Sequence, residues 1–347
     1  MTIIGWDLGG ANLKLARLEG ERIVDVAHIP CPIRQDRRKF DDALAAALAR
    51  VPEAASHAVT MTGELSDVFA SRADGVAYLV TLMRTATTGQ DLLLYAGRAG
   101  FLSPEDALHR VQDVASANWH ATAELVAARI GDGMLIDIGT TTTDLIPFRG
   151  GRVAARGTSD GERLTEGELL YAGVVRTPIM AIARDVPFKG RVQGIAAERF
   201  ATMADVYRIK GDLPADADPY PTPDGRGKSR NESIARLARM LGRDAADGET
   251  DDWAGAATHF ASCQLRQIVA AAIGLIAREG LSGEAPIIGA GCGRFLARRL
   301  AAESSRPYLD FAGCIEVDDT LRDLAACCAP AVAVAVLRER NGPLSGR

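Results

Sequence analysis

Two short stretches decide the fold: DLGGAN at Asp7–Asn12 and DIGTTT at Asp137–Thr142. Each places an aspartate at the end of an apolar run and follows it with small residues suited to a tight turn. The stretches lie 130 positions apart, and Gly20 matches Gly150 at the same offset. Because solenoid repeats recur every ~20–50 residues, a repeat at this distance indicates two related domains.

Each copy predicts a strand, a tight turn, a second strand, a Gly turn and a third strand. For the first copy we expect strands at Thr2–Asp7, Asn12–Leu18 and Arg22–His28. For the second copy we expect strands at Met134–Asp137, Thr142–Phe148 and Gly151–Arg156.

The rest of the chain alternates between helical and strand patterns, which predicts an α/β fold. We expect strands at Ala58–Met61 and Leu92–Tyr95, and a helix that opens at Ser103. Further helices are expected at Asp36–Arg50, Ser66–Arg84, His120–Arg129, Trp253–Arg278 and Asp319–Arg340, the last interrupted at Pro330. The predicted domains are residues 1–130 and 131–347, with a ligand cleft between them.

The composition of the repeated turns suits phosphate. Glycines let the backbone approach a ligand, and successive backbone N–H groups in such a turn can hold an anion. The candidate phosphate-binding residues are Gly9, Gly10, Ala11, Asn12, Gly139, Thr140, Thr141 and Thr142. Asp7 and Asp137 are placed to hold Mg²⁺ directly or through water. The alternative is a pair of ordinary β-hairpins with Gly turns.

The least regular stretch is the proline-rich segment 211–228, which we expect to be a long loop in the second domain. It ends near Arg226 and Lys228, whose charges favour an anionic ligand. A solvated surface loop is the alternative.

Composition excludes several classes of protein. The 347 residues are 47% hydrophobic and carry a net charge of −5, so the chain is globular and has no electrostatic reason to bind nucleic acid. We expect no membrane span, because the most apolar runs are shorter than the ~20 residues that one requires. With no signal peptide and no clustered ligands for zinc, the six cysteines are expected to be buried free thiols in a cytoplasmic protein. Ala-rich helices leave a homodimer possible.

The two aspartate hairpins resemble the phosphate loops of the actin-like ATPase superfamily, whose domains have an actin/ribonuclease H-like fold. A third loop of that superfamily, a strand running into G-x-G at a helix start, is matched by Gly289, Gly291 and Gly293. A G-x-G motif alone would equally suggest a dinucleotide fold. Its position late in the chain, after both hairpins, favours the actin-like arrangement.

Within that superfamily the chain resembles the hydantoinase/oxoprolinase branch, and there the short proteins of tetrahydromethanopterin-linked one-carbon metabolism. The narrower resemblance rests on the stretches around Asn118–His120 and Asp224–Gly227. It implies biosynthesis of methanofuran or methylofuran. The reaction would condense an aminomethyl-furan-methyl diphosphate with a phenolic tyramine, glutamyl-tyramine or tyrosine, giving an aryl ether and diphosphate.

This reaction assigns roles to further residues. Asp7 and Asp137 would hold Mg²⁺ at the diphosphate, and Lys14 would add charge to the leaving group. His120 and Asp144 are candidate bases for the phenol, although strand alternation suggests that Asp144 points away. Trp119, Tyr171 and Arg176 would hold the aromatic substrates, with core packing as the alternative for Trp119, Tyr171 and His120.

Two other functions remain open. One is an ATP-dependent small-molecule kinase, in which Asp137 is the base and the Gly289 loop holds the adenosine of ATP or ADP. The other is a non-catalytic, nucleotide-switched protein with a protein partner.

Overall fold

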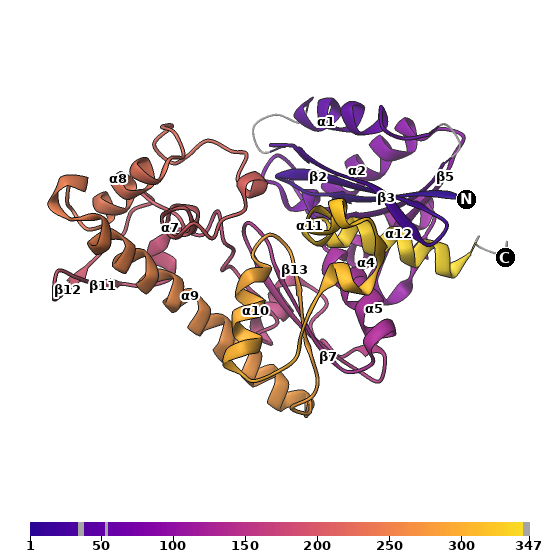
Figure 1. Ribbon diagram of the computed structural model, residues 1–347. Helices are drawn as coiled ribbons and strands as arrows, with labels where there is room; N and C mark the ends of the chain where they lie inside the picture. The colour runs from indigo at the N-terminus through magenta and orange to yellow at the C-terminus, as the bar shows by residue number, and fades with distance from the viewer. Residues whose placement is uncertain (34–37, 53–54, 343–347) are drawn as a thin grey trace.

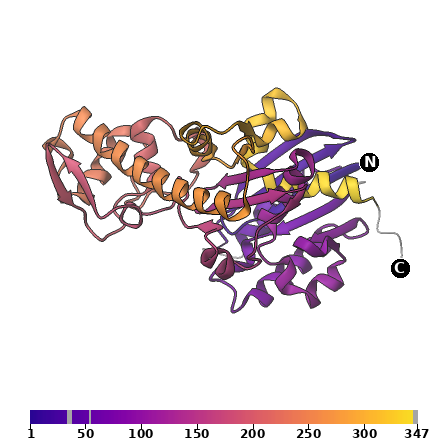
Figure 2. The ribbon, with the colours of Figure 1, turned by 90° about the horizontal axis from the view of Figure 1, so that it is seen from below.

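The computed structural model describes residues 1–33, 38–52 and 55–342, which form two sheet-centred lobes (Figure 1). An arm, residues 179–260, projects away from both sheets (Figure 2). This is the mixed α/β fold with two lobes that the repeat predicts.

The first lobe contains a seven-stranded sheet with the order β15-β3-β2-β1-β4-β5-β6. Its strands are β1 (Thr2–Leu8), β2 (Asn12–Glu19), β3 (Arg22–Pro30), β4 (Ala55–Met61), β5 (Asp91–Tyr95), β6 (Phe101–Leu102) and β15 (Glu316–Val317). Helices α1 (Arg38–Leu48) and α2 (Arg72–Ala86) cover one face, where Phe40, Leu44 and Leu79 join its apolar core. The predicted start of the first helix, Asp36, lies outside the described residues.

The second lobe contains the order β10-β8-β7-β13-β14, with β9 paired to β8. Its strands are β7 (Gly133–Ile138), β8 (Thr143–Arg149), β9 (Arg152–Val153), β10 (Leu169–Leu170), β13 (Ile287–Ala290) and β14 (Tyr308–Asp310). The repeat extends to the register of the hairpins: Asp7 lies opposite Lys14, and Asp137 lies opposite Asp144. The predicted pair of related hairpins is therefore confirmed.

Two 13-residue helices, α5 (Asn118–Ile130) and α12 (Ala329–Asn341), pack against each other between the sheets. Helix α12 is buried on nearly every side from Ala329 to Arg338, which explains why its sequence is apolar without a polar stripe. It contacts β1, β2 and β4, whereas α5 contacts β7, β8 and β9. Helix α5 thus packs on the sheet of the second lobe, whose strands follow it in the chain. Helix α12 packs on the sheet of the first lobe, whose strands come at the start of the chain.

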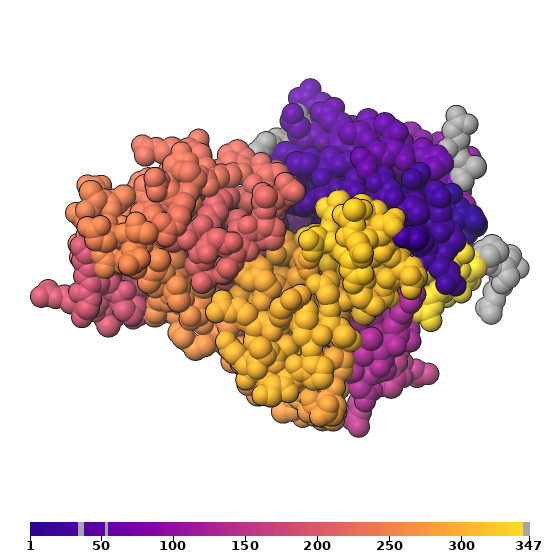
Figure 3. All heavy atoms as spheres, viewed as in Figure 1, coloured from indigo at the N-terminus to yellow at the C-terminus, as the bar shows by residue number. Residues whose placement is uncertain are grey.

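Residues 316–341 return to the first lobe, where they lie against its N-terminal strands (Figure 3). Strand β15 pairs with β3, and α12 packs on the first sheet. The chain crosses between the lobes twice, so a single boundary near residue 131 does not describe where the last residues pack.

The arm contains the hairpin β11 (Asp185–Phe188) and β12 (Arg191–Gly194) with α7 (Met203–Lys210) and α8 (Arg230–Met240). Helix α9 (Thr250–Glu279) begins in the arm and runs back along the second lobe. By length and composition alone α9 is apolar enough to cross a membrane. It buries Trp253, Phe260 and Leu265 against the arm and the second lobe, so packing accounts for its apolar residues.

Several shorter helices complete the chain. They are α3 (Pro104–His109), α4 (Val111–Val114), α6 (Asp160–Thr165), α10 (Arg294–Glu303) and α11 (Arg322–Cys327). The helix predicted to open at Ser103 is confirmed, since Ser103 caps α3, and the last helix breaks at Cys328, beside the predicted Pro330. The predicted start at Ser66 is wrong, because residues 63–65 form a 3₁₀ turn and Ser71 caps α2.

The contact between α12 and β1 leaves no room for a side chain at Gly5. A Cβ there would lie 1.9 Å from the carbonyl oxygen of Ala331. We predict that Gly5→Ala lowers the free energy of unfolding by about 2–3 kcal/mol, because the helix must shift off the sheet.

The matched control is Gly255→Ala on α9, where a Cβ meets nothing within 4 Å. It should leave stability unchanged or raise it by about 0.5–1 kcal/mol, because alanine is the better helix former. Urea unfolding of both variants measures the difference. Equal stability of the two variants would contradict the close α12–β1 contact.

Candidate functional site

The tips of the two aspartate hairpins open onto one cavity of about 300 Å³, which we call the hairpin cavity. The first hairpin contributes Asp7, Gly9, Gly10, Ala11, Asn12 and Lys14. The second contributes Asp137, Gly139, Thr140, Thr141, Thr142 and Asp144. Trp119, Arg163, Tyr171 and Arg176 also line it. The structure therefore brings the predicted carboxylates, both turns and three predicted substrate-binding side chains to one place.

The first hairpin presents a buried ion pair to this cavity. Lys14 Nζ lies 3.2 Å from Asp7 Oδ2, and Asp7 is only 3% exposed. The second oxygen, Asp7 Oδ1, is buried and has no hydrogen-bond partner among the described residues. A buried carboxylate oxygen without a partner is costly, so this atom is suited to a ligand or a cation.

The second hairpin presents a different pair. Arg163 Nη1 lies 2.8 Å from Asp144 Oδ1. The buried guanidinium of Arg163 also lies 4.0 Å from the centre of the Trp119 ring and donates to the carbonyl oxygen of Glu168. Arg163 therefore fixes the position of the Asp144 carboxylate.

The charges in the cavity shift the pKa values of its acids. Burial and the neighbouring Asp144 carboxylate raise the pKa of Asp137 to about 7, although Lys14 opposes the shift. Burial also raises the pKa of Asp144, against the influence of Arg163. Burial lowers the pKa of Lys14, but Asp7 and other nearby anions outweigh it and raise the pKa overall, so Lys14 stays protonated. A bound cation would relieve the repulsion between the carboxylates.

Helices α5 and α12 both begin at the cavity, where Asn118, Trp119 and Pro330 line its wall. Neither helix has a side-chain N-cap hydrogen bond. The N-terminus of a helix carries partial positive charge and outward N–H groups, which favour an anion. Two such ends add to Lys14 as anion-binding features.

The amides of the first glycine in each turn donate hydrogen bonds within the turn. Gly9 N–H donates to the carbonyl oxygen of Asn12, and Gly139 N–H donates to that of Thr142. These two amides close the turns and are not directed at a ligand. An anion would therefore be contacted by the residues that follow each glycine, and not by these two amides.

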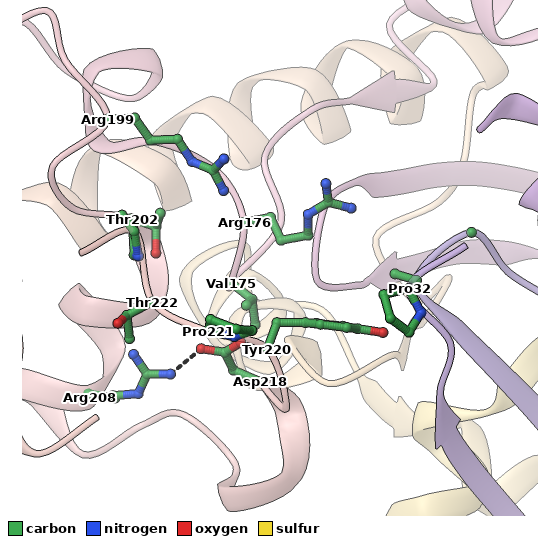
Figure 4. Close-up of a pocket in the computed structure, with 13 residues that line it drawn as sticks. Pro32, Val175, Arg176, Arg199, Thr202, Arg208, Asp218, Tyr220, Pro221 and Thr222 are labelled. Atoms are coloured by element: carbon green, nitrogen blue, oxygen red, sulfur yellow. Dashed lines mark hydrogen bonds and ion pairs between the residues drawn. The ribbon is translucent and has the colours of Figure 1, made fainter. Parts of the chain in front are cut away.

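A second cavity of about 270 Å³, the arm cavity, adjoins the first (Figure 4). The two share Gly10, Ala11 and Arg176 as lining residues. The proline-rich loop of the arm supplies Asp218, Tyr220 and three neighbours. Tyr220 accepts a hydrogen bond from Cys31 N–H and donates one to Asn12 Oδ1, both at 3.2 Å. This tyrosine joins the arm to the first hairpin.

His120 does not line either cavity, so the structure does not support it as the base. It lies behind Trp119, with its Nδ1 2.7 Å from the hydroxyl of Tyr95. Burial and the nearby Arg98 and Arg163 lower the pKa of His120 to about 4. Its place in the apolar core explains these properties.

The cations predicted from the proline-rich loop also lie outside both cavities. Arg226 is exposed, and Lys228 Nζ donates to the carbonyl oxygen of Asp218 at 2.5 Å. Lys228 therefore holds the loop that closes the arm cavity, and neither residue lines the arm cavity or the hairpin cavity.

The late glycines pack instead of lining a cavity. A Cβ on Gly289 would lie 2.5 Å from the Tyr308 hydroxyl, and one on Gly293 would lie 2.4 Å from the Ile138 side chain. Gly291, with φ +80°, passes so close to Asp137 that a Cβ would lie 2.5 Å from its Oδ1. Gly291 and Gly293 therefore pack against the second hairpin and Gly289 packs against Tyr308, and ligand binding by these glycines stays a prediction.

The expectation that Asp144 points away from the site is wrong. Asp144 lies directly opposite Asp137 in the β7–β8 pair, and residues that face each other across two strands share one face of the sheet. The repeat carried this signal, since Asp144 occupies the position of Lys14 in the first hairpin. Arg163, Arg199 and Tyr220 have no comparable local signal and were missed.

The donor set fits Mg²⁺ only in part. Asp7 Oδ1 and the Asp137 carboxylate are oxygen ligands of the kind that Mg²⁺ prefers. No group of three or more His, Cys, Asp or Glu that could hold a metal occurs in the described part of the chain. Mg²⁺ at this position would need substrate oxygens and water to complete its shell, as is usual for Mg²⁺ bound with phosphates.

The described cysteines carry no metal site and no disulfide. Cys31, Cys292, Cys314 and Cys328 are buried, and Cys263 and Cys327 are half-buried, all as free thiols. The prediction of free thiols is confirmed.

The chain is similar to proteins of one known family. The family model described as hydantoinase/oxoprolinase matches residues 56–341. A Methanocaldococcus jannaschii protein named (4-{4-[2-(γ-L-glutamylamino)ethyl]phenoxymethyl}furan-2-yl)methanamine synthase is 29% identical over 342 residues, covering 98% of each chain. A Methanococcus vannielii protein of the same name is 34% identical over 120 residues, 34% of this chain and 54% of that one.

Among solved structures, a nucleotide-free acetone carboxylase, described as ATP-dependent, matches with a TM-score of 0.57 at 10% identity. The match covers 96% of this chain and 70% of that chain. At this identity the likeness concerns the fold alone, and it supports the two-lobed actin-like arrangement.

Next to the hairpin cavity, Glu64 is a buried acid that is 2% exposed. Its Oε1 accepts a hydrogen bond from the hydroxyl of Ser116, a cavity-lining residue with φ +54°. Burial raises the pKa of Glu64 to about 7, although hydrogen bonds oppose the shift.

We predict that Glu64 makes stability fall as pH rises. Between its ordinary pKa and about 7 the unfolded chain loses this proton while the folded chain keeps it, so ionisation favours unfolding. The free energy of unfolding of Glu64→Gln, relative to that of the parent, should therefore increase by about 2 kcal/mol from pH 5 to pH 8. Urea unfolding at both pH values measures it, and an equal difference at the two would show that Glu64 ionises normally.

Proposed function

The chain belongs to the hydantoinase/oxoprolinase family, and from that premise we propose that it is a transferase of methanofuran or methylofuran biosynthesis. In the proposed reaction an aminomethyl-furan-methyl diphosphate and a phenol bearing an amino-acid or amine tail form an aryl ether and diphosphate. The names of the two methanogen relatives describe such a phenoxymethyl-furan product.

One observation carries the proposal: both aspartate hairpins, Lys14 and two helix N-termini surround a single cavity. Lys14 and the helix N-termini favour a multiply charged anion, and the aspartate carboxylates favour the divalent ion that accompanies it. Held there, the diphosphate would have both turns and a lysine to stabilise the negative charge that develops as it departs.

We propose that Asp7 and Asp137 hold Mg²⁺ at the diphosphate. When bound, the ion supplies positive charge to the leaving group. The unpartnered Oδ1 of Asp7 and the raised pKa of Asp137 support this assignment. Lys14, held protonated beside Asp7, adds a second positive charge.

In the proposed step the phenol oxygen forms a bond to the furan-methyl carbon while the bond from that carbon to the diphosphate oxygen breaks. The phenolic proton must leave, and the ordinary pKa of a phenol is about 10. We assign Asp144 as the acceptor of this proton, because it lines the cavity and Arg163 fixes its carboxylate. Its raised pKa makes it a stronger base than an exposed aspartate.

The product identifies the reaction. We predict that incubation with the furan-methyl diphosphate, γ-glutamyltyramine and Mg²⁺ yields the aryl ether and diphosphate, detected by mass spectrometry. Parallel incubation with ATP in place of the furan-methyl diphosphate tests the kinase alternative. Phosphorylated phenol or ADP with no ether would contradict the proposed reaction.

Asp144→Asn tests the base. We predict that kcat falls by about 10²–10⁴-fold, with little change in KM for the diphosphate, because the variant keeps the shape of the side chain and cannot accept the proton. In the parent, kcat should rise with pH in the acidic range as Asp144 loses its proton. In Asp144→Asn, kcat should not show this rise.

The control is Asp185→Asn, an exposed carboxylate on β11 of the arm. It should retain the parental rate and pH profile. A parental kcat in Asp144→Asn, in a variant that melts normally, would rule out Asp144 as the base.

A further inference from the structure

We propose that the arm cavity binds the carboxylate end of the phenolic substrate, with Arg199 as the anchoring residue. This inference rests on the proposed function and specifies the second substrate: a phenol whose far end carries a carboxylate, as an amino-acid group does.

The position of the arm cavity suits a second substrate. It meets the hairpin cavity at Gly10, Ala11 and Arg176. A phenol with its hydroxyl near Asp144 can therefore extend past the first hairpin into the arm cavity without leaving protein contact. The diphosphate, held between the hairpins, does not occupy this space.

The charge of the arm cavity selects an anion. Arg176, Arg199 and Arg208 line it, against the single carboxylate of Asp218. Arg208 is paired with Asp218, as the dashed line in Figure 4 marks. Arg199 forms no hydrogen bond or ion pair with any residue in the described part of the chain, so its charge is available to a ligand.

The same charge argues against the other substrate. The aminomethyl group of the furan is a cation at neutral pH, and the guanidinium of Arg199, which forms no ion pair with a described residue, would repel it. The furan amine must therefore point elsewhere, which leaves the arm cavity to the phenol.

The walls of the arm cavity suit an organic body of moderate size. Pro32, Val175, Pro221 and Pro223 give it apolar surface, and Tyr220 spans from the arm to the first hairpin (Figure 4). Apolar walls with a few placed polar groups are typical of small-molecule sites. An arginine at such a site recognises a carboxylate by charge-assisted hydrogen bonds.

The test compares two acceptors, γ-glutamyltyramine and tyramine, which share the phenol; tyramine lacks the glutamyl group that carries the carboxylate. For Arg199→Met we expect kcat/KM with γ-glutamyltyramine to fall at least about tenfold, mainly through KM, because a hydrogen bond to a charged group is lost. The values for tyramine and for the furan-methyl diphosphate should stay at parental levels. Arg199→Lys should restore part of the loss.

The matched control is Arg191→Met, which removes an exposed arginine on β12 that lines neither cavity. It should leave both acceptors unaffected. Equal losses for tyramine and γ-glutamyltyramine in Arg199→Met, or no loss for either, would overturn the assignment of Arg199 while leaving the proposed reaction intact.

Calorimetric titration of the two acceptors, with Mg²⁺ and pyrophosphate present, separates this inference from the proposed reaction. Tighter binding of γ-glutamyltyramine than of tyramine, lost in Arg199→Met, supports the arm cavity even if no ether forms. Binding of γ-glutamyltyramine that is no tighter than that of tyramine, or no binding of either, would overturn it.

Discussion

The packing of α5 against α12 between the two sheets places the aspartate hairpins around one cavity. Each helix lies against the sheet of one lobe and begins beside the turns of both hairpins. Gly5 permits the approach of α12 to β1, and no larger residue would fit there. The same contact that stabilises the fold therefore directs two helix N-termini at the site.

The charged groups of the hairpin cavity are only partly paired with one another, which suits the cavity to a charged ligand. Lys14 balances Asp7 within the first hairpin, and Arg163 of α6 balances Asp144 of the second hairpin. Asp137 forms no ion pair with a described residue, and Asp7 retains one oxygen without a partner among them. In the proposed complex, a polyphosphate with its divalent ion would satisfy these groups together, because the ion would meet the carboxylates and the anion would meet Lys14 and the helix ends.

The hairpins were predictable because their signals are local: an apolar run, an aspartate and small turn residues, repeated at one offset. The same repeat also predicts the direction of the Asp144 side chain, because Asp144 occupies the position that Lys14 has in the first hairpin. His120 was misassigned because nothing in its neighbours tells a cavity-facing histidine from one packed on Tyr95. The return of α12 to the first lobe and the reach of Tyr220 to Asn12 depend on contacts between residues hundreds of positions apart.

We propose that both hairpins hold one diphosphate. A crystal structure of the protein grown with Mg²⁺ and pyrophosphate would show whether they do. We expect pyrophosphate between the turns at residues 9–12 and 139–142, in contact with Lys14, and Mg²⁺ between it and the carboxylates of Asp7 and Asp137. Pyrophosphate bound to one turn alone, or at the late glycines Gly289–Gly293, would contradict it.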